Sequence, residues 1–175
     1  SRIDEELTIQ STATTPPDTL KVFDSFATRN EFHGAELGLQ FVFDRPTWRC
    51  DIMAKVGLGS MSEQVTITGR QDPTDAGGGL LARSASNIGT FTRNEFAAVP
   101  ELGLNWAWKV NSWAELNLGY SFIYWSKIIQ PGSAIDPQLA VNLSDPFTGT
   151  LRPAFNFSDG PYWVHGVNLG LTCKF

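Results

Sequence analysis

Charged residues, cysteines, histidines and long hydrophobic runs are all scarce in this chain. Asp, Glu, Lys and Arg make up 18% of the 175 residues, whereas about 25% is usual in soluble domains. The net charge is −5 and the basic residues form no cluster, which argues against a nucleic-acid partner. No run of about 18 apolar residues is present, so the sequence excludes a transmembrane helix. A transmembrane β-barrel stays possible, because its strands give only a weak hydropathy signal.

The scarcity of reactive side chains limits the chemistry that the sequence suggests. The cysteines and histidines, Cys50, Cys173, His33 and His165, match no metal-ligand spacing. No serine lies in a G-x-S-x-G elbow, and the triple glycine at 77–79 lacks the lysine of a phosphate loop. We therefore expect no enzyme activity, no metal and no cofactor. We also expect two free thiols rather than a disulfide.

The chain does contain a regular alternation of side chains, which is clearest in its last eleven residues. Small or polar side chains occupy the even positions there, and large or apolar ones occupy the odd positions. The odd residues are His165, Val167, Leu169, Leu171, Cys173 and Phe175. A period of two predicts a β-strand with two different faces. An aromatic last residue is typical of the closing strand of a transmembrane barrel.

The same alternation recurs and predicts about six strands. Its segments are 33–43, 48–60, 98–110, 113–126 and 162–175, with a less regular one at 2–10. Each clear segment supplies the roughly 9–11 residues that a tilted strand needs to cross a membrane. We therefore predict an all-β fold, an antiparallel transmembrane β-barrel of the outer-membrane type. Residues 1–175 would form one barrel domain or the C-terminal portion of one. A soluble β-sandwich, which also alternates, is the alternative fold.

The predicted connections alternate in length. Asp44–Thr47 and the turn around Asn111 and Ser112 are tight, whereas 11–32, 61–97 and 127–161 are long. Short periplasmic turns and long extracellular loops are typical of outer-membrane barrels. The sequence has no signal peptide, so we expect a mature or truncated chain.

If the apolar face meets lipid, the opposite face lines the lumen. Its predicted charges are Glu36, Arg49, Asp51, Lys55, Glu101, Lys109, Glu115 and Lys174. The tight turn at 44–47 places Glu36 opposite Lys55, and Lys109 and Glu115 become neighbours across the next turn. Opposite charges across neighbouring strands stabilise each other modestly. The balance of acids and bases favours a self-neutralised interior over a charge-selective pore, although a weakly selective pore stays open.

Aromatic residues gather at the ends of the predicted strands, where amphipathic rings favour the membrane interface. The predicted interface aromatics are Trp48, Trp113, Tyr124, Trp125, Tyr162 and Trp163.

Several strings between residue 20 and the end carry a resemblance to a known family. They are Phe23–Gly34, Gly78–Ala82 with Ser86–Gly89, Phe96–Asn105, Gly119–Ser126, Gln130–Gly132 with Ile135 and Asp136, and the closing Phe175. Through them the chain resembles the outer-membrane β-barrel proteins of planctomycetes, long catalogued as a domain of unknown function.

The resemblance implies an outer-membrane barrel without an established substrate. Family members are usually longer, so we expect this chain to be the C-terminal part of a larger barrel or a shortened one. Family members also share aromatic ends, which implies that Phe175 is the signal read by the barrel-assembly machinery. Six strands are fewer than the eight of the smallest common barrels. We therefore expect partners: a missing N-terminal half, extra strands inside the long loops, or another subunit.

Two functions remain as hypotheses for a protein of the bacterial outer membrane that is surrounded by outer-membrane lipid. The first is a passive, porin-like channel for small solutes. The second is a structural or surface-interaction barrel with a closed lumen, whose extracellular loops bind an envelope partner.

Overall fold

The structure is a computed structural model that describes residues 1–15, 18–73, 77–138 and 151–173. Lys174 and Phe175, predicted to be a lumen-facing charge and an assembly signal, lie outside the described residues. Within the described ranges, no helix is long and apolar enough to cross a membrane.

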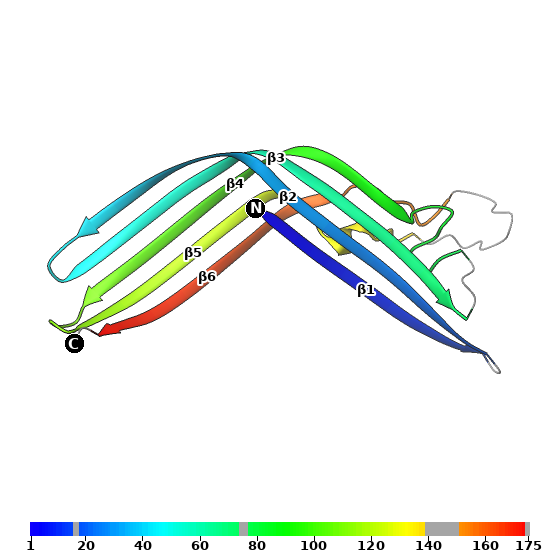
Figure 1. Cartoon of the computed structure of the whole chain (residues 1–175), viewed down its shortest axis with the longest axis horizontal. Coiled ribbons are helices and arrows are strands. Elements are labelled where there is room, and N and C mark those ends of the chain that lie inside the picture. Colours follow the sequence, from blue (N-terminus) through cyan, green and yellow to red (C-terminus); the bar gives the residue numbers. More distant parts are fainter. Residues whose placement is uncertain (16–17, 74–76, 139–150, 174–175) are drawn as a thin grey trace. The chain divides into compact units, whose positions relative to one another are not determined.

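Six strands form one antiparallel sheet, in which neighbours along the chain are hydrogen-bonded neighbours in space (Figure 1). The elements are β1 (Arg2–Thr15), β2 (Asp18–Asp44), β3 (Trp48–Asp72), β4 (Gly89–Lys109), β5 (Ala114–Ile129), the short 3-10 helix η1 (Pro131–Ala134) and β6 (Asp159–Cys173). The prediction of an all-β fold with about six strands is confirmed. The described residues form one sheet rather than two facing sheets, which does not fit the β-sandwich alternative.

The strands are longer than the apolar alternation predicted. The expected loop 11–32 is wrong, because β1 pairs with β2 residue by residue from Arg2 opposite Glu31 to Thr15 opposite Asp18. Both sides of this hairpin carry polar side chains, so hydropathy conceals its alternation. Its many threonines nevertheless suit a strand, since β-branched side chains fit the pleated surface.

The other two expected loops are also shorter than predicted. β3 continues to Asp72 and β4 begins at Gly89, while β5 continues to Ile129 and β6 begins at Asp159. The long connections are therefore 73–88 and 130–158. The two tight turns are confirmed, with Arg45 N–H donating to Trp48 O at 2.8 Å and Val110 N–H donating to Ala114 O at 3.0 Å.

The chain divides into two compact units, each built from parts of the long strands. The first unit contains Ser1–Phe32, Met61–Glu95 and Ile128–Gly160. The second unit contains His33–Ser60, Phe96–Lys127 and Pro161–Phe175.

The second unit has an apolar face of large exposed side chains. These include Leu37, Leu39, Phe41, Val56, Leu58, Leu102, Trp106, Trp108, Leu118, Val167, Leu169 and Leu171. The exposed fraction of Leu37 reaches 75%, and the ring centroids of Trp48 and Trp106 stack at 4.8 Å. A contiguous apolar surface of this extent does not suit water. We call this side of the strands the apolar face, and the side that carries Glu36 and Lys55 the polar face.

The first unit contains a hydrophobic core under its connections. Side chains of β2 and β3 pack with side chains of the connections and of β5. The fully or almost fully buried members are Phe26, Val65, Ile67, Ala82, Ile129 and Ala134. The strand neighbours of these core residues, such as Ser25, Gln64 and Thr66, are polar and point to the other side because side chains alternate along a strand.

The polarity of the strands therefore inverts along their length. Alternate residues of a strand lie on the same side. On β3, the side that carries Lys55 continues through Gly57 and Gly59 to the buried Val65 and Ile67. On β2, the side that carries Glu36 likewise includes the buried Phe26. The strand positions that carry charges in the second unit thus alternate in step with those that carry the hydrophobic core in the first.

Replacing a core aromatic tests the importance of this packing. We expect Phe26→Ala to lower the free energy of unfolding by about 3–5 kcal/mol, because it removes buried contacts and leaves a cavity. Leu39→Ala on the exposed apolar face is the control, and we expect a change of about 0.5 kcal/mol or less in detergent. Urea unfolding in micelles, followed by tryptophan fluorescence, measures both. Equal losses would contradict the proposed location of the core.

Candidate functional site

The polar face of the second unit carries charges that neutralise each other. Lys55 Nζ lies 3.2 Å from Glu36 Oε1, which confirms the predicted pair. Gly38 makes room for this pair, because a Cβ atom at Gly38 would lie 2.7 Å from Lys55 Cγ. Both side chains are part-exposed, so the interaction stabilises the sheet only modestly.

The other two described basic side chains on this face, Arg49 and Lys109, also contact carboxylates. Arg49 Nε donates to Asp51 Oδ2 at 2.9 Å on the same strand. Lys109 lies opposite Glu115 in the register of β4 and β5, as predicted. Its ammonium group, however, contacts Asp44 of the neighbouring turn at 3.7 Å.

Between the charges, the polar face is lined by glycine and amide side chains. Glu101 belongs to this face on β4, one residue before Leu102 of the apolar face. Asn117 Nδ2 donates to Thr172 Oγ1 at 3.1 Å. Gly119 provides space for Asn168, whose amide oxygen would collide with any Cβ at that position. The lining is thus polar, and its described charges comprise three ion pairs and two further acids, Glu101 and Glu115.

The aromatic residues predicted for the membrane interface divide between the two faces. Trp48 lies on the apolar face, as does Trp163, whose ring centroid lies 6.4 Å from that of Phe122. Tyr124 shares the parity of Phe122 on β5. Trp113 lies in the β4–β5 connection and is 56% exposed.

Trp125 and Tyr162 lie on the other side of the sheet from Tyr124 and Trp163. Their ring centroids are 5.9 Å apart, and Trp125 is only 8% exposed. Adjacent residues of a strand point to opposite faces. Trp125 therefore cannot share the face of Tyr124, and Tyr162 cannot share that of Trp163.

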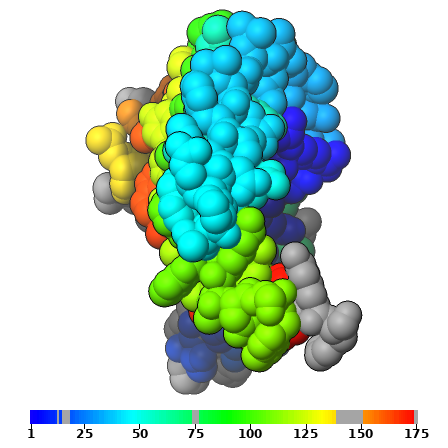
Figure 2. Space-filling model, turned by 90° about the vertical axis from the view of Figure 1, so that its left-hand side faces the viewer, coloured from blue at the N-terminus to red at the C-terminus, as the bar shows by residue number. Residues whose placement is uncertain are grey.

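The two tight connections lie side by side at one end of the second unit. Figure 2 shows the β2–β3 connection in cyan beside the β4–β5 connection in green. Lys109 N–H donates to Thr47 O at 2.9 Å and joins them. A shallow hollow of about 310 Å³ lies nearby, lined partly by Pro46, Lys109 and Trp113.

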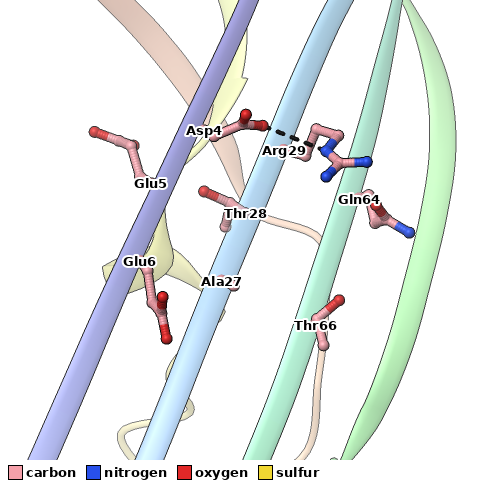
Figure 3. Close-up of a pocket in the computed structure, with 8 residues that line it drawn as sticks. All are labelled: Asp4, Glu5, Glu6, Ala27, Thr28, Arg29, Gln64 and Thr66. Atoms are coloured by element: carbon pink, nitrogen blue, oxygen red, sulfur yellow. Dashed lines mark ion pairs between the residues drawn. The ribbon is translucent and has the colours of Figure 1, made fainter.

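In the first unit, the side opposite the hydrophobic core is polar. A hollow of about 300 Å³ on β1–β3 is lined by Asp4, Arg29, Gln64 and Thr66, among others (Figure 3). Arg29 Nε lies 3.4 Å from Asp4 Oδ1, and both side chains are about half exposed. An ion pair with this exposure suits a surface in contact with water. Within the described residues, no group of histidine, cysteine and acidic side chains is arranged to hold a metal ion.

Buried polar side chains of the first unit fasten its connections to its strands. Asp24 is 1% exposed and accepts hydrogen bonds from the N–H groups of Leu80, Leu81 and Ala82 at 3.2, 3.1 and 2.8 Å. Asn30 accepts from Ile129 N–H and donates to Ile129 O, both at 2.9 Å. Each side chain satisfies backbone groups that burial would otherwise leave without partners.

Arg93 joins three strands on the same side. Its guanidinium contacts Glu63 Oε2 at 2.6 Å and Asp159 Oδ1 at 2.8 Å, and it lies 4.6 Å from the ring centroid of Phe157. Glu63 is 0% exposed, so losing Arg93 would leave a buried charge without its principal partner.

These buried polar residues were not among those predicted from the sequence. The sequence did contain one sign of them. Asp24, Asn30 and Glu63 occupy alternate strand positions that are otherwise taken by buried apolar side chains. Their partners lie 30 to 99 residues away along the chain. The sequence pattern therefore marks the positions but not the contacts.

Asp136 organises the connection that precedes β6. It accepts from Ala154 N–H at 2.7 Å, from Arg152 at 2.7 Å and from Gln138 N–H at 2.9 Å. These donors lower the pKa of the Asp136 carboxyl from 3.8 to about 2.

A family model described as "Putative beta barrel porin-7" matches the chain over residues 1–175. No curated protein and no solved structure matches it. The full-length match confirms the resemblance to an outer-membrane barrel family and the predicted fold class.

A double-mutant cycle tests the pair on the polar face. We expect Glu36→Gln and Lys55→Gln to show a coupling of about 0.2–1 kcal/mol in the free energy of unfolding. The matched control combines Glu36→Gln with Lys109→Gln, which have no common partner and should be additive. A coupling in the control as large as in the test pair would contradict a specific Glu36–Lys55 interaction.

The low pKa of Asp136 predicts an acid-sensitive contribution to stability. A carboxyl with a lowered folded-state pKa stabilises fully above its unfolded pKa of 3.8, and this contribution disappears as the pH falls through about 2. We expect the stability difference between wild type and Asp136→Asn to stay constant from pH 7 to pH 5 and to shrink towards pH 2. Urea unfolding at each pH measures it. A difference unchanged at pH 2 would contradict the assignment.

Proposed function

This chain belongs to the beta barrel porin family that matches its whole length, and from that membership we propose that it forms wall strands of a bacterial outer-membrane channel. The channel passes small polar solutes passively. The observation that carries this proposal is the opposition of the two faces in the second unit. One face exposes large apolar side chains, and the other is lined by glycine, amides and paired charges.

The apolar face is suited to lipid. The aromatic side chains of this face that we assign to the membrane interface are Trp48 at the start of β3, Tyr124 within β5 and Trp163 within β6. Trp113 joins them from its exposed position in the β4–β5 connection.

The polar face is suited to a weakly selective lumen. Ion pairs Glu36–Lys55, Arg49–Asp51 and Lys109–Asp44 hold its described basic side chains, and Glu101 and Glu115 are two further acids that form no ring. Charge selectivity in pores requires rings of one sign of charge. We therefore infer that this channel selects by size and polarity more than by charge.

The sheet edges of the second unit require partners in a membrane. The pairing of β1 with β2 ends where Arg2 lies opposite Glu31, and β6 is the last strand of the sheet order. Each backbone group left unpaired in hydrocarbon costs several kcal/mol. We propose that further strands, from an N-terminal half or another subunit, pair with β6 and with residues 33–44 of β2. The barrel-assembly machinery would insert the wall, with Phe175 as its signal.

The hydrophobic core of the first unit supports a second candidate function. There the connections pack against the alternate strand positions whose counterparts in the second unit carry charges. If they close the lumen, the protein is a structural or surface-interaction barrel rather than a channel.

Conductance in planar lipid bilayers separates the two functions. We expect purified protein to give discrete steps with weak preference between K⁺ and Cl⁻. Boiled protein is the control, together with a gel-shift on heating that reports a folded barrel. Folded protein that gives no conductance steps would contradict the channel function and favour the closed barrel.

A further inference from the structure

We propose that the polar face of β4, β5 and β6 in the second unit binds neutral, hydroxyl-rich solutes, namely saccharides. The site is here called the amide platform. It is the polar side of residues 103–107, 117–121 and 166–170, all of which belong to the second unit. The inference rests on the proposed channel function and names the class of solute that the channel would recognise.

Polar and small residues face each other across the strands of the amide platform. In each of its cross-strand pairs between β4 and β5, one member is polar and the other is glycine or alanine. The pairs are Gly103–Ser121, Asn105–Gly119 and Ala107–Asn117. Each polar side chain therefore has a small neighbour on the adjacent strand, which leaves its polar group accessible.

Two side-chain amides converge at the centre of the platform. Asn105 Oδ1 lies 2.8 Å from the position that a Cβ atom at Gly119 would occupy, and Asn168 Oδ1 lies even closer to that position. Since β5 lies between β4 and β6 in the sheet, the two amides approach Gly119 from opposite sides. Only glycine has no Cβ atom, so it allows both oxygens to come this close.

The amides of Asn105 and Asn168 are available to a ligand. Both residues are exposed, and within the described part of the chain neither side chain has a hydrogen-bond partner. Asn117, in contrast, donates to Thr172 Oγ1 at 3.1 Å. An asparagine amide has two N–H donors and an oxygen that accepts. The platform therefore presents uncharged donors and acceptors next to each other.

These groups suit hydroxyls better than anions. A hydroxyl donates and accepts at the same time, so it can bind an amide in either orientation. The described basic side chains of the polar face are held in ion pairs, which leaves an anionic solute without a free cation there. Glu101 and Glu115 on the same face repel anions further.

An aromatic ring on the same side favours sugar rings over open-chain hydroxyl compounds. Tyr162 shares the side of Asn168 on β6, because alternate residues of a strand lie on the same side. Its ring lies 5.9 Å from that of the buried Trp125, and Tyr162 itself stays partly exposed. Ligand sites combine aromatic surface with a few polar groups. The C–H faces of a sugar ring pack on such a ring while its hydroxyls reach the amides.

Block of the ionic current by maltohexaose, a neutral oligosaccharide, measures binding in planar bilayers. We expect maltohexaose to reduce the current through wild type with saturation at high concentration. Poly(ethylene glycol) of similar size is the control solute, because its ether oxygens accept hydrogen bonds but do not donate them. We expect it to reduce the current without saturation.

Substitution of the amides tests the residues. We expect Asn105→Ala and Asn168→Ala each to raise the half-blocking concentration of maltohexaose about threefold to tenfold, because each removes hydrogen bonds to the solute. Gln40→Ala is the matched control. It removes an exposed amide from the same polar face, but on β2, which is not adjacent to β4, β5 or β6. Its half-blocking concentration should equal that of wild type.

The outcomes separate the amide platform from the channel. Conducting wild type that maltohexaose and poly(ethylene glycol) block alike overturns the inference and leaves the channel intact. Equal losses of block in Gln40→Ala and the two platform variants also overturn it. If the platform variants do not fold, as judged by gel migration on heating, the comparison of the two solutes on wild type decides.

Binding without conductance is measured by saturation-transfer NMR in micelles. If folded wild type gives no conductance steps, the channel function fails. Transfer to maltohexaose that is lost in Asn105→Ala and Asn168→Ala but kept in Gln40→Ala then still supports the amide platform. If no transfer to maltohexaose occurs either, both proposals fail.

Discussion

A β-strand presents its residues alternately to two sides, and this constraint governs the whole chain. β2 and β3 contain 27 and 25 residues, respectively. A tilted strand needs only about 9–11 residues to cross a hydrocarbon layer. Strands of this length must therefore pass through two kinds of surroundings, and neither side can keep one polarity throughout. On β2, the result is that the exposed apolar side chain of Leu37 and the buried apolar side chain of Phe26 belong to opposite sides of the strand.

The inversion also explains why buried polar side chains accumulate in the first unit. Where connections fold back onto a strand face, their backbone N–H groups leave water and need acceptors. Asp24 and Asp136 provide them, and Asn30 does the same for Ile129 at the end of β5. The buried Glu63–Arg93–Asp159 cluster has a different consequence. Such clusters add little net stability but penalise any arrangement that separates their members, so this one specifies how β3, β4 and β6 come together.

The sequence predicted those parts of the fold in which one strand face is consistently apolar. Segments such as 33–43 and 98–110 were recognisable because Leu, Phe and Trp recur at every second position. The pair Glu36–Lys55 followed from counting back from a short turn, which fixes register. The family resemblance, confirmed by the full-length match, added the class of barrel.

The rest could not be predicted because its determinants are either mixed or distant. In the hairpin of β1 and β2, one side carries polar side chains and the other carries both polar and apolar ones. Hydropathy therefore shows no clear period of two there. Trp125 and Tyr162 were grouped with their aromatic neighbours Tyr124 and Trp163, although alternation along each strand places the two pairs on opposite sides of the sheet. Asp24 contacts residues 56 to 58 positions away. No local pattern contains such a contact.

The paired charges of the second unit bear on what a channel built from it would select. Three ion pairs hold its described basic side chains, and Glu101 and Glu115 remain as separate acids on the neighbouring strands β4 and β5. Charge selectivity in pores requires a ring of one sign of charge. Two separate acids do not form such a ring, so selection in a channel of this kind would come mainly from its dimensions and its polarity.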